Sequence, residues 1–176
     1  MRVITGTARG RRLKTLEGDS VRPTTDKVKE SVFNIIQFEI EGRRVLDLFA
    51  GSGQLGIEAL SRGAAFAVFV DASRNSVAVT KDNIATTGFG GVSRVELGDS
   101  LAFLDRTTEK FDIAFLDPPY GTDLVQKALE RVLPHMTPGS TVICETPADE
   151  FLPETAGDFI AKRYKYGKTA LTVYRN

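Results

Sequence analysis

The sequence predicts an α/β fold built on one mostly parallel sheet, and three observations support this prediction. Short apolar runs alternate regularly with helix-like segments between residues 45 and 145. These runs are nearly continuous in apolar residues, as expected for strands that helices cover on both faces. The last two runs are joined by Gly167-Lys168, a turn typical of an antiparallel hairpin. We therefore expect a sheet of seven strands with helices on both faces and a C-terminal antiparallel hairpin.

The chain begins with a basic segment, residues 1–20, that we expect to form a short β-hairpin. Residues 1–14 contain no acid, and their cations are Arg2, Arg9, Arg11, Arg12 and Lys14. Glycines lie among these cations and apolar residues flank them, which favours a hairpin over a disordered terminus. Such a hairpin would present its cations to a polyanion. The predicted organisation is this arm followed by one domain over residues 21–176.

The remaining elements follow the arm in a regular order. Thr24-Thr25 with an acid in the next position marks a helix start, and we expect this helix to end at Gly42. Predicted strands and helices then alternate. The predicted strands are 45–49, 66–70, 92–97, 111–116, 141–145, 159–166 and 169–174, and the predicted helices are 54–62, 75–86, a short one from residue 100, and 124–133.

Composition limits the class of protein and its setting. The chain has 176 residues, 41% of them hydrophobic, and a net charge of zero, which fits one globular domain. It shows no apolar stretch of membrane-spanning length and no signal-peptide pattern at its start. Its single cysteine, Cys144, lies in a predicted strand and excludes a disulfide framework or a multi-cysteine metal site. We therefore expect a cytoplasmic monomer with no metal and no membrane partner.

A glycine-rich loop, Asp47 to Gly56, joins the first predicted strand to its helix. Its spacing satisfies G-x-G-x-x-G, and Asp71 lies 20 residues after Gly51, so an NAD-dependent oxidoreductase is one candidate. However, Asp47 beside the loop would repel a pyrophosphate and attract a ligand with a cationic amine or sulfonium. S-adenosylmethionine has both of these groups and lacks phosphates. It is therefore the favoured ligand of the loop.

Acids lie at the ends of four successive predicted strands, at Asp47, Asp71, Asp99 and Asp117. The carboxyl ends of parallel strands meet at one edge of a sheet, so we expect these side chains to converge on one ligand. Asp71 would accept hydrogen bonds from the two ribose hydroxyls. Asp99, with Ser100, would contact the adenine amino group, cap a helix, or do both.

The tetrapeptide Asp117-Pro118-Pro119-Tyr120 follows the apolar run 111–116 directly. Neither proline has an N–H to donate to a strand ladder, so the strand must stop there. A carboxylate, free carbonyls and an aromatic ring are left at its carboxyl end. Such acceptors beside a flat ring suit a planar substrate with an amino group, for example a nucleobase. We predict that these four residues are catalytic.

Together these motifs resemble those of class I S-adenosylmethionine-dependent methyltransferases, and more closely those of the bacterial 16S ribosomal RNA (guanine-966-N2)-methyltransferases. The resemblance covers nearly the whole chain and rests on the arm, on residues 22–26, on residues 47–64 and on the tetrapeptide. The sequence departs from these proteins at Gln54, where they usually have a small apolar residue, and at Asp71, where many have Glu. The resemblance implies a Rossmann-like fold. It also implies a cofactor-binding set of Arg22, Thr24, Asp47, Phe49, Ala50, Gly51, Gly53, Asp71, Ala72, Asp99 and Ser100, with the first two beside the methionine end of S-adenosylmethionine.

The function implied by the resemblance is methyl transfer to the N2 amino group of a guanine in 16S ribosomal RNA, in an assembled or assembling 30S subunit. Asp117 and the Pro118 carbonyl would orient the amine, Tyr120 would stack on the flipped base, and the nitrogen would attack the sulfonium methyl in line. The arm would bind phosphates of the RNA.

Three alternatives remain. The first is an amino-methyltransferase acting on adenine or cytosine of RNA or DNA, which would use the same residues. The second is an NAD-dependent oxidoreductase, which Asp47 and the lack of a substrate domain argue against. The third is a non-catalytic RNA-binding protein that keeps the cofactor fold, which the intact tetrapeptide argues against.

Overall fold

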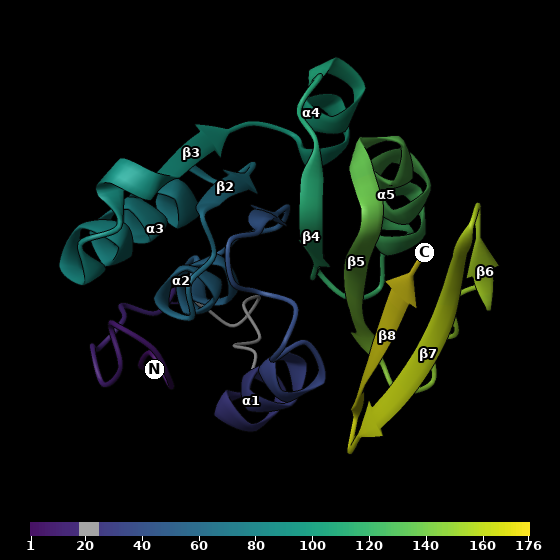
Figure 1. The fold of residues 1–176 in the computed structure, drawn as a ribbon, viewed down its shortest axis with the longest axis horizontal. Coiled ribbons are helices and arrows are strands. Elements are labelled where there is room, and N and C mark those ends of the chain that lie inside the picture. Colours follow the sequence, from purple (N-terminus) through teal and green to yellow (C-terminus); the bar gives the residue numbers. More distant parts are fainter. Residues whose placement is uncertain (18–24) are drawn as a thin grey trace.

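One sheet organises the fold, which we describe from a computed structural model that covers residues 1–17 and 25–176. Its strands lie in the order β3-β2-β1-β4-β5-β8-β7-β6 (Figure 1). The strands from β1 to β5 pair in parallel, and β8, β7 and β6 continue the sheet as antiparallel strands. The strand bounds are β1 Arg44–Asp47, β2 Phe66–Asp71, β3 Ser93–Leu97, β4 Phe111–Leu116, β5 Met136–Pro147, β6 Thr155–Ala156, β7 Phe159–Tyr166 and β8 Thr169–Arg175.

Helices cover both faces of the sheet. Strand residues alternate between two apolar clusters, so that Val45 packs with one face and Leu46 with the other. The first cluster includes side chains from α1, α2 and α3, and the second includes side chains from α4 and α5. The helix bounds are α1 Asp26–Ile35, α2 Gln54–Ser61, α3 Arg74–Thr87, α4 Ser100–Arg106 and α5 Leu124–Val132, with the short 3-10 helices η1 Gly90–Val92 and η2 Leu133–His135.

The predicted fold class is confirmed, with two differences in detail. An eighth strand, β6, borders β7, and its two residues are too short to show a periodic pattern in the sequence. The first helix begins as expected, because the Thr25 side chain accepts a hydrogen bond from the Val28 N–H at 3.3 Å. The predicted end at Gly42 was wrong, since the helix ends at Ile35; Gly42 lies in the turn before β1, where its φ is +72°.

The N-terminal arm packs against the helical face formed by α1, α2 and α3 (Figure 1). Its two halves pair in antiparallel fashion at Arg2 and Arg12. The Val3 N–H donates to the Arg11 carbonyl at 2.9 Å, and the Leu13 N–H donates to the Met1 carbonyl at 3.0 Å. Val3 and Leu13 are buried, so the arm is anchored through its apolar residues.

A buried carboxylate fixes the tip of the arm to α2. Glu58 has no exposed surface, and it accepts from the Ile4 N–H at 2.8 Å and the Thr5 N–H at 2.9 Å. The Lys29 Nζ of α1 lies 3.2 Å from the same carboxylate and donates to the Arg2 carbonyl at 2.9 Å. These bonds satisfy groups that would otherwise be buried without partners.

Gly6 lies where the arm passes closest to α2. Its φ is +87°, and a Cβ built there would lie 1.8 Å from the backbone oxygen of Ser61. The neighbouring Thr7 N–H donates to that oxygen at 2.8 Å. Only glycine allows both this backbone conformation and this approach.

Candidate active site

The loop between β1 and α2 is held in a fixed turn that opens toward the carboxyl ends of the strands. Its Ala50 N–H donates to the Val70 carbonyl of β2 at 3.0 Å. Gly53 precedes α2 with a φ of +78°, and a Cβ there would lie 2.9 Å from the Thr80 side chain. The Thr80 hydroxyl donates to the Gly51 carbonyl at 2.8 Å. The loop backbone is therefore ordered by neighbouring elements before any ligand binds.

Asp47 lies beneath this loop and is only 2% exposed. Its carboxyl group accepts from the Gly56 N–H at 3.0 Å, across the turn. Burial raises the pKa of Asp47 to about 8, the Gly56 hydrogen bond opposes this rise, and the nearby charges of Asp117 and Asp71 add to it. At neutral pH this group is therefore mostly protonated, and a cation bound beside it would favour its ionised form.

Asp71 ends β2, and Asp99 lies just after β3. The carboxylate of Asp71 accepts from the Gly51 N–H and the Ser73 N–H, both at 2.8 Å, so it joins the glycine loop to the loop after β2. Asp99 accepts from the Ala102 N–H at 2.8 Å and caps α4. The predicted capping role of Asp99 is thus confirmed, and Asp99 also faces the cavity described below.

The tetrapeptide Asp117 to Tyr120 follows β4 as expected and ends the strand. Pro118 is buried, Pro119 is exposed, and Asp117 and Tyr120 are half-buried. The Thr122 hydroxyl donates to the Pro119 carbonyl at 2.9 Å and closes the turn that follows. The Tyr120 hydroxyl donates to Glu145 Oε1 at 3.2 Å, which connects the tetrapeptide to the neighbouring strand β5.

One cavity of about 770 Å³ brings these groups together. This volume lies within the usual range for small-molecule pockets. Of the predicted site residues that the structure describes, those that line it are Asp47, Phe49, Ala50, Gly51, Asp71, Ala72, Asp99, Ser100, Asp117, Pro118, Pro119 and Tyr120. Gly53 is not in the lining and shapes the turn instead. Arg22 and Thr24 lie outside the described residues.

Sequence reasoning missed several lining residues. The arm contributes Met1, Thr15 and Leu16, so the segment that carries the cations also forms a wall of the cavity. Glu145, at the end of β5, is a fifth carboxylate in the lining and is 7% exposed. It is the last residue of the predicted strand 141–145, and this place at a strand end was the available signal, because the predicted acids also lie at strand ends.

The lining is acidic and also holds a buried amide oxygen. Among the described residues that line the cavity, five carry a carboxyl group and none is Lys, Arg or His. The Gln54 Oε1 atom is buried in this lining and has no hydrogen-bond partner among the described residues. A ligand with a positive charge and several N–H or O–H donors would fit these groups, and S-adenosylmethionine is such a ligand. The phosphates of a dinucleotide would find no Lys, Arg or His side chain in this described lining.

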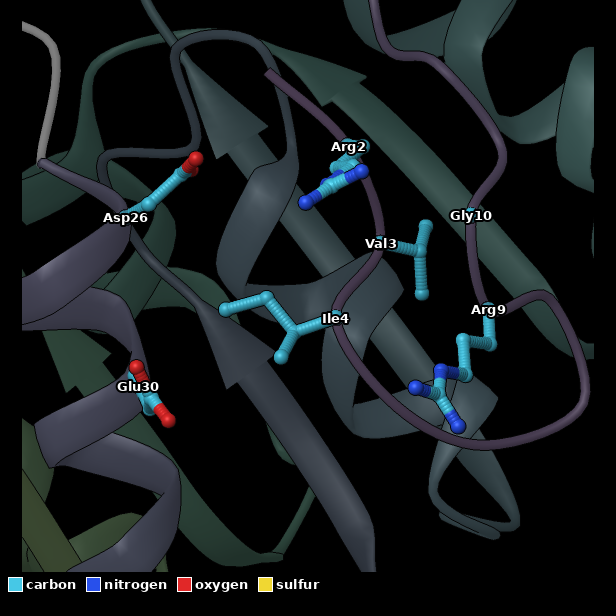
Figure 2. A pocket seen from close by; sticks show the side chains of 7 residues that line it. All are labelled: Arg2, Val3, Ile4, Arg9, Gly10, Asp26 and Glu30. Carbon is cyan, nitrogen blue, oxygen red and sulfur yellow. The ribbon is translucent and has the colours of Figure 1, made fainter.

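The arm cations lie outside this cavity. All five predicted RNA-binding side chains, Arg2, Arg9, Arg11, Arg12 and Lys14, are exposed. Figure 2 shows a second pocket, of about 300 Å³, in which Arg2 and Arg9 of the arm lie across from Asp26 and Glu30 of α1. Lys14 pairs with Asp82 at 2.7 Å on the exposed side of α3.

Residues 1–17 and 25–176 hold neither a candidate metal site nor a membrane-spanning helix. They contain no cluster of three or more His, Cys, Asp or Glu side chains that could hold a metal ion. No helix among them has the length and apolar character needed to cross a membrane.

Comparisons with known proteins agree with this geometry. Residues 1–175 match the family described as Conserved hypothetical protein 95. The chain is 40% identical over 181 residues to the putative rRNA methyltransferase YlbH of Bacillus subtilis, covering 99% of this chain and 98% of that one. It is 32% identical over 178 residues to the ribosomal RNA small subunit methyltransferase D of Escherichia coli K12, covering 99% and 89%. A solved structure described as the putative methyltransferase yhhF of Escherichia coli superposes with a TM-score of 0.89 at 31% identity, covering 100% and 97%.

Proposed function

Since the chain belongs to the Conserved hypothetical protein 95 family, that of the ribosomal RNA small subunit methyltransferases D, we propose that it methylates the N2 amino group of a guanine in 16S ribosomal RNA. One observation carries the proposal. The tetrapeptide Asp117 to Tyr120 lines the same cavity as the glycine loop and the acids after β1, β2 and β3. An amine-orienting group therefore lies beside a site suited to a cationic methyl donor.

The cofactor half of the cavity consists of the glycine loop with Asp47, Asp71 and Asp99. S-adenosylmethionine supplies a methyl group on a positively charged sulfur when it is bound. Asp47 and Gln54 lie on the loop side and would hold the cationic amino end. Asp71 would accept from the ribose hydroxyls, and Asp99 with Ser100 would face the adenine.

The substrate half consists of the residues after β4. An exocyclic amine is a weak nucleophile because its lone pair is delocalised into the ring. The Asp117 carboxylate and the Pro118 carbonyl would accept the two amine hydrogens and orient that lone pair toward the cofactor half. The half-buried Tyr120 ring would stack on a base that has left its helix. Positioning and electrostatics would thus provide most of the rate enhancement.

The arm supplies the proposed contact with RNA. Its five exposed cations lie on a segment that also contributes Met1, Thr15 and Leu16 to the cavity wall. Phosphates bound by the arm would therefore lie close to the cavity mouth. The acidic lining would exclude phosphates from the cavity itself and leave room for the base. We propose that the substrate is an assembled or assembling 30S subunit in the cytoplasm, and that the protein acts as a monomer.

Labelled methyl transfer tests the proposal. Purified protein is incubated with labelled S-adenosylmethionine and 30S subunits that lack this methylation, with naked 16S RNA and DNA in parallel. Nuclease digestion then identifies the modified nucleoside. Label in N2-methylguanosine of 16S RNA is expected. Label in adenosine or cytidine, or transfer to DNA alone, would refute the guanine assignment. Tight binding of NAD without binding of S-adenosylhomocysteine in calorimetric titrations would refute the methyltransferase assignment itself.

A further inference from the structure

Glu145 occupies the strand end directly beside the proposed catalytic tetrapeptide. The parallel register of β4 and β5 pairs Leu116 with Cys144, so the next residues, Asp117 and Glu145, lie side by side. Glu145 is also paired with Leu171 of the antiparallel strand β8. It is therefore held in the middle of the sheet, with neighbours on both sides, and its position is rigid.

The side chain of Glu145 belongs to the substrate half of the cavity. It is 7% exposed and lines the cavity together with Asp117 and Tyr120. The Tyr120 hydroxyl donates to its Oε1 atom at 3.2 Å. A carboxylate offers about four acceptor positions on two oxygens, so it can hold this hydroxyl and accept from a ligand at the same time.

Two neighbouring acceptors match one nucleobase edge better than the others. On its Watson–Crick edge guanine carries an N1–H donor next to its N2 amine, so it presents two adjacent donors. Adenine and cytosine present an amine next to an unprotonated ring nitrogen, which is an acceptor. A carboxylate oxygen that faces that ring nitrogen would set one acceptor against another in a buried place, which is repulsive and costly.

We propose that Glu145 is the residue that selects guanine, by accepting the N1–H hydrogen while Asp117 accepts from the N2 amine. This inference rests on the proposed function and deepens it. Asp117 by itself would accept from the amine of any of the three bases. Glu145 adds the acceptor that separates guanine from adenine and cytosine.

A simpler role for Glu145 would be to position Tyr120 through the hydroxyl contact. Such a role would change the rate for every base to the same extent. A selecting role changes the ratio of rates between two bases that differ in whether N1 carries a hydrogen. The ratio therefore distinguishes the two roles.

The experiment compares guanine with 2-aminopurine at the nucleotide that the methylation assay identifies. 2-Aminopurine keeps the amine but has an unprotonated N1. Both RNAs are prepared by splint ligation and assembled into 30S subunits, and kcat/KM is measured for each. We expect the unsubstituted protein to favour guanine by at least about 10-fold, as expected where the wrong base sets an acceptor against a buried acceptor.

The Glu145→Gln variant should reverse part of this preference. Its amide can donate to the unprotonated N1 of 2-aminopurine, so the guanine to 2-aminopurine ratio should fall by about 10-fold or more. Tyr120→Phe removes the hydroxyl contact and should lower both rates while leaving the ratio unchanged. Glu154→Gln, an exposed glutamate in the loop before β6, is the matched control for loss of a carboxylate.

Two outcomes would overturn the proposal. The first is equal use of the two bases by the unsubstituted protein, a result that does not depend on any variant folding. The second is an unchanged ratio in Glu145→Gln, provided that its thermal midpoint and its affinity for S-adenosylhomocysteine match those of Glu154→Gln. Failure of the proposed function would look different, because no N2-methylguanosine would then form in any 16S RNA.

Discussion

Replacing Asp47 with Asn should stabilise the unliganded protein, and the gain should depend on pH. The pKa of Asp47 is raised from its ordinary value of 3.8 to about 8, mainly by burial. Between these two values the unfolded chain ionises this carboxyl and the folded protein does not. The unfolded state therefore binds fewer protons, and folding stability falls as the pH rises. The amide in the Asp47→Asn variant carries no such linkage, and its oxygen can still accept from the Gly56 N–H.

The magnitude follows from the width of this pH window. Each pH unit within it changes the free energy of unfolding by about 1.4 kcal/mol. The difference between the two proteins should therefore grow with that slope from pH 5, reach about 4 kcal/mol at pH 7 and level off only above the folded-state pKa. For a protein of this size a gain of about 4 kcal/mol corresponds to a rise in Tm of roughly 8–16 °C.

Denaturant unfolding at several pH values between 5 and 8 measures the difference. The Asp149→Asn variant, at an exposed position, serves as the control and should show no such pH-dependent gain. A stability difference that stays constant across this range, or a loss of stability in Asp47→Asn, would refute the reasoning. Calorimetry adds a second readout, because the variant should bind S-adenosylmethionine more weakly and release no proton from this position.

Three further predictions concern catalysis, RNA binding and the arm. Asp117→Ala should lower methyl transfer by at least about 100-fold while calorimetric affinity for S-adenosylhomocysteine persists, and loss of that affinity would contradict a role confined to the substrate half. The double variant Arg11→Ala with Arg12→Ala should weaken RNA binding and reduce the slope of log K against log salt by about 2, whereas an unchanged slope would show that the arm does not bind phosphates. Glu58→Ala should destabilise the protein by about 3–5 kcal/mol in denaturant unfolding, because it leaves Lys29 and two arm amides buried without their carboxylate. Glu58→Gln keeps an acceptor oxygen and should lose less stability. A loss under about 1 kcal/mol in Glu58→Ala would argue against this anchor.

The parts of the site that follow from one strand and its own loop could be predicted from the sequence. Asp47, Asp71, Asp99 and Asp117 each lie at or just after the end of a predicted strand, and parallel strands bring such positions to one edge. Glu145 is likewise the last residue of a predicted strand. Its position beside Asp117, however, depends on the register of β4 against β5, two strands separated by a helix. Local sequence patterns carry no information on that register.

The arm also shows that local sequence patterns do not predict contacts between distant parts of the chain. Its cations and its tendency to form a hairpin were evident from residues 1–14. The contacts that anchor it join Ile4 and Thr5 to Glu58, more than fifty residues away in the chain. A single glutamate in the otherwise largely apolar segment of helix α2 was a local sign of such a partner. The residues that bind this glutamate could be identified only from the folded structure.

The anchoring of the arm determines how it would capture RNA. Terminal basic segments often search for nucleic acid as flexible chains and become ordered on contact, with a loss of conformational entropy at that moment. Here the backbone amides of Ile4 and Thr5 donate hydrogen bonds to the buried carboxylate of Glu58, so the arm becomes ordered when the protein folds. If the arm binds RNA as proposed, its cations would therefore meet the phosphates from a preformed backbone, and less conformational entropy of the chain would be lost on binding.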